Sequence, residues 1–219
     1  MKQCISYRPR ALVSPEVLSQ SRIIDLRGLH RGSGDSDPSG SIYVRERLTV
    51  KLPEESDTTD RHIRLQYPMQ VREAHFRATE SLIPLTISRV TQPFKVYGED
   101  RTLYEMHFDL TDVSLAEPVT LEIEAQVARS AVRRKYAKGI GRYKFETDLK
   151  TDLVSVWLLF PTDRPYRTYS LLHYPGDRSS PPEVMQSRFT IDHPYGTLIG
   201  WSVINPVRDS VYECRWSME

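Results

Sequence analysis

The sequence has no long hydrophobic run and no apolar stretch near its start. Its longest apolar run, residues 153–160, is far shorter than the ~20 residues that a membrane-spanning helix needs. Arg8, Pro9 and Arg10 stand where a secretion signal would have its apolar segment. We therefore expect no membrane association and a cytoplasmic location.

Cysteine is nearly absent, with Cys4 and Cys214 at opposite ends of the chain. Because no secretion signal is found, the expected compartment keeps thiols reduced, and no disulfide is predicted. Cys214 alternates with Tyr212 and Trp216, which places these side chains on one face of a predicted strand. Such a setting is typical of a buried thiol without a chemical role.

The chain also has almost no net charge, because 30 Lys and Arg residues are balanced by 29 Asp and Glu residues, giving +1. A protein that binds nucleic acid through bulk electrostatic attraction usually carries a much larger basic excess. We therefore do not expect nucleic acid as the main partner. Any binding of anions would have to come from basic residues that cluster locally.

The sequence carries no recognisable signature of a catalytic or metal site. None of its 6 histidines stands four residues from another or beside a cysteine, so no zinc site is predicted. Gly139 and Gly141 are followed by Lys144 where a dinucleotide-binding motif has its third glycine. The sequence thus predicts no cofactor and no enzymatic activity. An enzyme whose residues are dispersed over several strands is the remaining alternative.

What the sequence has in abundance is two-residue alternation. From Val119 to Val127, apolar residues alternate with Thr, Glu and Gln, as in a strand with one face in a core and the other in water. The 15 prolines fall mostly between such runs, which is typical of short strands joined by turns. The sequence therefore predicts an all-β fold, an antiparallel β-sandwich made of one large or two small units.

Predicted strands cover much of the chain after residue 40. They are residues 42–52, 63–69, 83–89, 93–97, 103–110, 119–127, 153–160, 166–174, 184–191, 198–204 and 210–216. Residues 153–160 are apolar at both odd and even positions. This pattern predicts a central strand that is covered on both faces.

The N-terminal part shows a different pattern. Ser14, Pro15 and Glu16 have the residue types of a helix start, so a short helix to about Arg22 is predicted. Residues 31–40 are rich in glycine and serine and predict a flexible linker. The expected organisation is a helix and linker over residues 1–40, a β-sandwich unit over 41–128, a basic connector over 129–144 and a second β-rich unit over 145–219.

The sign of the charge changes abruptly near residue 128. Residues 99–124 are rich in acids, whereas residues 129–144 contain none. The candidate ligand-binding residues of this basic segment are Arg133, Arg134, Lys135, Lys138, Arg142 and Lys144. Guanidinium groups and the interleaved tyrosines suit a phosphate group or a nucleotide. A solvated connector that pairs with the preceding acidic strand is the simpler interpretation.

The last third of the chain has a distinct order of aromatic and proline residues: Phe160 and Pro161, then Trp201 and Pro206, then Tyr212 and Trp216. In this order it resembles the strand-rich accessory and sensor modules attached to bacterial signalling and antiviral-defence proteins. The resemblance implies an accessory or sensing role and assigns no catalytic residue.

These features together predict a non-enzymatic interaction or sensing module that binds a partner protein or a ligand within an intracellular assembly. The alternative is a domain that binds a nucleotide or another phosphorylated ligand through residues 129–144. A protein interface would appear as an exposed apolar patch, whereas a phosphate site would show salt-sensitive binding.

Overall fold

The computed structural model describes the chain in segments. The described residues are 8–11, 16–29, 41–53, 62–69, 74–78, 85–96, 99–114, 117–128, 140–147, 149–175, 181–185, 191–192 and 195–218. Within these segments the only helix is the short 3-10 turn η1 (Arg27–Leu29), and the other regular elements are strands. The all-β prediction is confirmed. No helix in these segments is long or apolar enough to cross a membrane.

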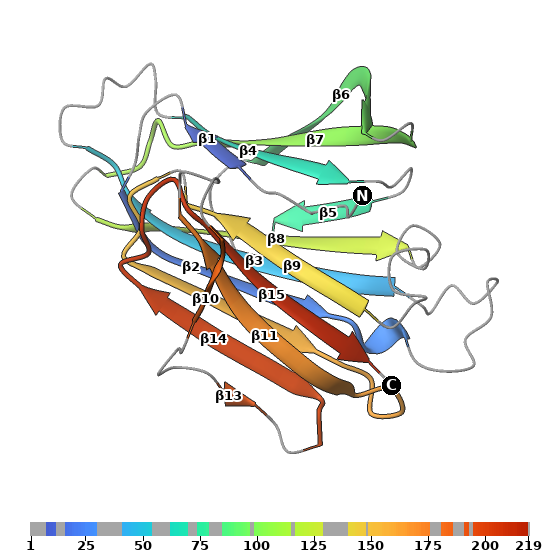
Figure 1. Ribbon diagram of the computed structural model, residues 1–219. Coiled ribbons are helices and arrows are strands. Elements are labelled where there is room, and N and C mark those ends of the chain that lie inside the picture. The colour runs from blue at the N-terminus through green and yellow to red at the C-terminus, as the bar shows by residue number, and fades with distance from the viewer. Residues whose placement is uncertain are drawn as a thin grey trace.

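The strands form three sheets (Figure 1). The largest, called here the main sheet, has seven strands in the order β13-β14-β10-β2-β3-β8-β5. Their bounds are β13 Ile191–Asp192, β14 Leu198–Ile204, β10 Leu153–Leu159, β2 Glu16–Asp25, β3 Ser41–Lys51, β8 Val119–Ala128 and β5 Ala74–Ala78.

Two smaller sheets accompany the main sheet, each with four strands. The facing sheet has the order β12-β11-β15-β9, with β12 Glu183–Val184, β11 Tyr166–Tyr174, β15 Val211–Met218 and β9 Ile140–Glu146. The flanking sheet has the order β1-β4-β7-β6, with β1 Arg8–Ala11, β4 His62–Met69, β7 Glu99–Asp109 and β6 Leu85–Val96.

The predicted strands at 42–52, 63–69, 103–110, 119–127, 153–160, 166–174, 198–204 and 210–216 are confirmed within a few residues. The predicted pair 83–89 and 93–97 forms one strand, β6, whose pairing with β7 is shifted between Val90 and Phe94. The sequence did not predict β1, β2, β5 or β9. Of the predicted strand 184–191, only its two ends lie among the described residues, as parts of β12 and β13.

The predicted N-terminal helix is wrong where the structure describes it. Residues Glu16–Asp25 form β2, which pairs with β3 on one side and β10 on the other. Two ladders of hydrogen bonds and the burial of Val17 and Ile24 outweigh a local capping signal, because intrinsic helix preference is worth only tenths of a kcal/mol per residue. Ser14 and Pro15, like the predicted linker at 31–40, lie outside the described residues.

One strand pair departs from the predicted antiparallel arrangement. Val154 to Leu159 of β10 pair in parallel with Gln20 to Asp25 of β2, while the other strand pairs are antiparallel in the described part of the chain. Parallel neighbours need a long connection. Here more than half of the sequence separates the two strands, so local patterns do not reveal the pairing.

Strand β2 joins the two halves of the chain in one sheet. On one side of it lie β3 and β8, from the predicted unit 41–128, and on the other lie β10 and β14, from the predicted unit 145–219. The predicted connector 129–144 includes the first part of β9, while residues 129–139 lie outside the described segments. The predicted boundary therefore does not separate the sheets.

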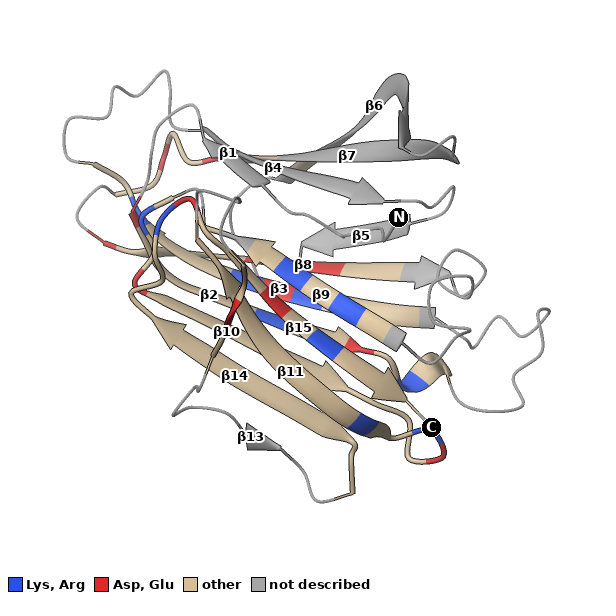
Figure 2. Ribbon diagram, viewed as in Figure 1, with Lys and Arg blue, Asp and Glu red and all other residues tan. Residues whose placement is uncertain are grey.

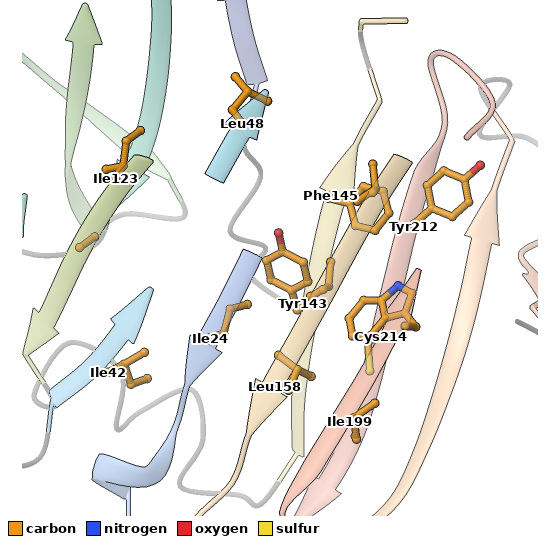
Figure 3. Close-up of a cluster of buried hydrophobic side chains, with 14 of the residues drawn as sticks. Ile24, Ile42, Leu48, Ile123, Tyr143, Phe145, Leu158, Ile199, Tyr212 and Cys214 are labelled. Carbon is orange, nitrogen blue, oxygen red and sulfur yellow. The ribbon is translucent and has the colours of Figure 1, made fainter. Parts of the chain in front are cut away.

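The main and facing sheets pack against each other through a shared core (Figures 1 and 3). The ring of Tyr143 on β9 meets the edge of Trp201 on β14, with ring centroids 6.4 Å apart. Phe160, just after β10, makes a similar contact with Trp216 on β15 at 5.8 Å. Cys214 is a free thiol within this core, as its alternation predicted.

One ion pair lies inside the core. Arg22 of β2 and Glu46 of β3 are opposite each other in register, and their nitrogen and oxygen atoms are 2.6 Å apart. Gln20 donates to the other oxygen of Glu46, and Arg22 donates to the hydroxyl of Tyr143 on the facing sheet. The network therefore links two strands of the main sheet to one strand of the facing sheet.

Candidate functional site

The outward face of the main sheet carries an apolar surface that is partly exposed within the described residues. Along β10, Val154, Val156 and Leu158 are buried, while the alternate residues, among them Trp157, are partly exposed. The sequence predicted that other parts of the protein cover both faces of this strand. Within the described residues only the inward face is fully covered, and the outward face retains apolar side chains in contact with solvent.

Neighbouring strands extend this apolar surface. By register, Ile23 of β2 lies beside Trp157, Leu198 of β14 lies beside Leu159, and Ile204 lies beside Leu153. We call this surface the outer apolar patch. It consists of Ile23, Leu153, Trp157, Leu159, Leu198 and Ile204. Ile204 is its most exposed member, at 55%. A row of serine hydroxyls crosses the patch, and within it Ser155 and Ser202 are 2.8 Å apart.

Trp157 lies flat on the sheet because its neighbour has no side chain. Gly200 is paired with Trp157, and a Cβ atom built on Gly200 would lie 2.4 Å from the indole ring. This is much closer than any ordinary contact between carbon atoms. The glycine therefore lets the indole cover the backbone of β14 and keeps the surface of the patch flat.

No charged residue occurs on β10 or β14 (Figure 2). Charge on the outward face begins at the end of β2, where Asp25, beside Leu159 and Tyr43 in register, forms an ion pair with Arg27, and it continues on β3 and β8. On these two strands Arg45 Nε lies 2.7 Å from Glu122 Oε1 and 3.2 Å from Glu124 Oε1, and the hydroxyl of the exposed Tyr43 accepts a hydrogen bond from Gln126. The outward face thus has an uncharged half beside a half whose acidic and basic groups are paired.

The dimensions of the patch limit what it can bind. Strands lie ~4.8 Å apart and advance ~3.3 Å per residue, so the outward surface of β10, β14 and the adjoining part of β2 has an area of roughly 300 Å². Patches of this size are often functional. A specific protein interface buries roughly 800 Å² per partner, so a protein bound here must also contact the polar half on β3 and β8.

The predicted basic segment is only partly within the described residues. Arg133, Arg134, Lys135 and Lys138 lie outside them, while Arg142 and Lys144 are on β9. Tyr143 and Phe145 point into the core, so Arg142 and Lys144 occupy the outward face of the facing sheet. The structure therefore places these two basic side chains on one surface of a strand.

Lys144 is not available as an independent anion ligand, because it pairs with a carboxylate. Its Nζ lies 2.9 Å from Glu213 Oε2 on β15 and 5.1 Å from the centre of the Tyr174 ring. Burial would raise the pKa of Glu213, but hydrogen bonds from Arg215 and Lys144 outweigh it and hold the pKa below its ordinary value. Glu213 is therefore ionised and shared between two cations.

Arg215 is the basic residue that sequence analysis missed. Its Nε donates to Glu213 and its Nη2 donates to the hydroxyl of Tyr174. In register, Arg215 lies directly opposite Arg142. The alternation around Cys214 could have placed Glu213 and Arg215 outward together, but only the strand pairing brings Arg215 beside Arg142.

The remaining titratable groups form no metal site in the described segments. No cluster of His, Cys, Asp and Glu there could hold a metal ion. Burial raises the pKa of the Cys214 thiol far above its ordinary value, so the reactive thiolate is suppressed. His173 stacks on Tyr212 with ring centroids 4.8 Å apart, as a core residue would.

Comparison with known proteins identifies the fold but no family. No protein-family model and no curated protein matches the sequence. A candidate nutrient-binding protein from Legionella pneumophila has a similar structure, with a TM-score of 0.50 and 11% identity over 97% of this chain and 70% of its own. A candidate protease from Parabacteroides distasonis has a TM-score of 0.51 and 12% identity over 93% of this chain. This chain spans 40% of the length of that protein.

Proposed function

We propose that the chain is a non-enzymatic β-sandwich interaction module whose outer apolar patch binds a folded partner domain. The observation that carries this proposal is the outward face of β10, which is apolar in sequence but only partly covered by described residues. Exposed apolar area is unfavourable in water, and a partner would supply the missing cover. Protein binding also accounts for the absence of charge on β10 and β14.

The residue types on this face suit protein recognition. Trp157 lies in the apolar half, while Tyr43 and Arg45 lie in the polar half. Tryptophan, tyrosine and arginine contribute most to binding energy at protein interfaces, usually within an apolar centre and a polar rim. Because Arg45 is already paired with Glu122 and Glu124, the expected partner surface is apolar at its centre and carries little net charge.

Similarity to longer proteins supports a folded domain as the occupant. In the Parabacteroides structure the matched region is 40% of a longer chain, so this fold occurs there alongside additional polypeptide. The partner would be such a domain, in a separate protein or in a longer form of the same one. A place in an intracellular assembly, such as bacterial defence signalling, is part of this proposal and depends only on the aromatic order of the last third.

Photocrosslinking from single positions would test the docking surface. A photoreactive amino acid at Ile204 should crosslink to a partner domain in the cells that make the protein, and mass spectrometry would identify it. Val184 is the matched control, because it is also a β-branched residue in a strand and 72% exposed, but it belongs to the facing sheet. Crosslinks from Ile204 only to a second copy of the chain would contradict the proposal.

Charge substitution would then measure how much the patch contributes. Ile204→Arg would place an unpaired charge in an apolar interface, and we expect affinity for the identified partner to fall by about a hundredfold. Val184→Arg should leave the affinity unchanged. Equal affinity of the Ile204→Arg and wild-type proteins, with normal circular dichroism spectra, would exclude the patch as the docking surface.

A further inference from the structure

The turn that joins β14 to β15 carries apolar side chains at its surface. Ile204, the last residue of β14, is 55% exposed, and Val207 within the turn is 57% exposed, whereas Pro206 between them is buried. Ile204 also belongs to the outer apolar patch. The turn therefore continues the apolar surface past the end of β14, on the side of the patch that lies away from β3 and β8.

The backbone of Val207 is fixed although its side chain is exposed. Its N–H donates to the hydroxyl of Tyr212 at 2.9 Å, and its carbonyl accepts from the hydroxyl of Thr147 at 2.5 Å. Tyr212 and Thr147 are both buried, so they hold the turn from the core side. A segment whose backbone groups are bonded to buried side chains has little freedom to move.

Both ends of the turn are fixed as well, in a strained conformation. The N–H of Asn205 donates to the carbonyl of Asp152, and the N–H of Asp209 donates to the carbonyl of Thr147, each at 2.7 Å. Asn205 and Asp209 have φ angles of 47° and 57°, in a region that most residues other than glycine avoid. Such strain persists only where surrounding contacts impose it, and it is common where a segment binds a ligand. A turn that only connected two strands would accommodate glycine at both positions.

We propose that this turn is a preformed anchor of the interface with the partner domain, and that Val207 inserts into an apolar pocket of that partner. The inference rests on the proposed function, because the partner is the domain that covers the outer apolar patch. The patch has an area of roughly 300 Å², whereas a specific interface buries roughly 800 Å² per partner, so contacts beyond the patch are needed. A side chain whose backbone is already fixed loses less conformational entropy on binding, so its burial contributes more to affinity.

Photocrosslinking from position 207 tests the anchor separately from the proposed function. In the cells that make the protein, a photoreactive amino acid in place of Val207 should crosslink to the same partner as one in place of Ile204. The two crosslinked sites on the partner should be close together, because three residues span at most about 11 Å. The same amino acid in place of Val184, on the facing sheet, is the control and should not crosslink to this partner.

The two proposals fail in different ways in this experiment. Crosslinks from Ile204 without crosslinks from position 207 would overturn the anchor and leave the proposed function standing. Failure of both positions to crosslink to a partner domain would overturn both.

A conservative substitution measures the contribution of the side chain. Val207→Thr keeps the shape of the side chain but replaces a methyl group with a hydroxyl, and it should lower the affinity for the crosslinked partner about tenfold. Val184→Thr is the matched control and should leave the affinity unchanged. Both positions are exposed in the free protein, so Tm should stay the same in both variants. Equal affinity of Val207→Thr and the wild-type protein would overturn the inference.

Glycine substitutions test whether the fixed conformation contributes to binding. Asn205→Gly combined with Asp209→Gly relieves the backbone strain and makes the turn more flexible. We expect Tm to be maintained and the affinity for the partner to fall about fivefold. Unchanged affinity in this double variant would show that the turn is only a connection and would overturn the proposal.

Discussion

At the scale of single residues, Arg22 and Glu46 are the most constrained groups in the described core. Their exposed fractions are 2% and 1%, and both are charged. Removing a charge from water is costly, so a buried ion is tolerated only when it is paired and hydrogen-bonded. Gln20 and Tyr143 add one hydrogen bond each to the pair, and Tyr143 reaches across from the facing sheet.

Breaking this ion pair should destabilise the protein strongly. Glu46→Ala leaves the Arg22 guanidinium buried without its counter-charge, which costs about 3–5 kcal/mol in comparable pairs. Tyr143→Phe removes only the hydroxyl that accepts from Arg22 and should cost about 1–3 kcal/mol. Chemical denaturation would measure both. If Glu46→Ala lost less stability than Tyr143→Phe, the pair would not hold the core as described.

Glu213 should make stability depend on pH in the acidic range. Its pKa is below the ordinary value of 4.5, so the folded protein favours the ionised carboxylate more than the unfolded chain does. This contribution is complete above about pH 4.5 and is lost as the pH falls through the lower folded-state pKa. The stability difference between wild type and Glu213→Gln should therefore shrink below this pH in denaturation measurements. A difference that grows on acidification would contradict the assignment.

At the scale of elements, two glycines show how strands make room for a tryptophan side chain, one in the core and one on an outward face. Gly141 of β9 lies under Trp216 in the core, where an added Cβ would be 2.2 Å from the indole. Gly200 of β14 lies under Trp157 on the outward face of the main sheet. Neither is in the left-handed backbone region, so each is required for space and not for its conformation.

Alanine at these glycines should have unequal effects. Gly141→Ala would force Trp216 against a packed core, and we expect a loss of about 1–3 kcal/mol or more. Gly200→Ala should cost less in stability, because Trp157 can move toward solvent, but it would distort the outer apolar patch. Urea denaturation and partner binding would separate the two outcomes. Equal destabilisation by both substitutions would mean that Trp157 is as tightly enclosed as Trp216.

At the scale of the whole molecule, β2 is the element that unites the chain. It lies between β3 and β10, so the main sheet contains strands from both sides of the basic segment. A division of the chain there would separate β2 from β10 and expose the edges and core of both parts. Exposed strand edges and apolar faces disfavour independent folding.

Separate fragments test this dependence. Residues 140–219 contain the facing sheet with β10, β13 and β14 but lack β2 and β3. We expect this fragment alone to show no cooperative unfolding transition, and mixing it with residues 1–139 to restore one. Circular dichroism during heating would measure the transitions. Independent cooperative unfolding of each fragment would support the two-unit organisation that the sequence predicted.

The sequence predicted part of the candidate surfaces. Arg142 and Lys144 were singled out by charge, and the apolar outward side of β10 was visible as a run without alternation. Arg215 was missed because it is separated from Arg142 by most of the C-terminal half. The outer apolar patch was missed because sequence cannot tell whether an apolar face is covered.

By itself, the sequence determined the all-β character and the inward faces of β3, β8 and β15. Side chains alternate across any strand, so a two-residue period records which side is buried whatever the pairing. Only the tertiary structure decided that residues 16–25 form a strand, that β2 and β10 run parallel, and that Arg142 faces Arg215. Those features depend on contacts between segments that are distant in the sequence. The energy of these contacts exceeds the local conformational preference, and the contacts produce no periodic pattern in the sequence.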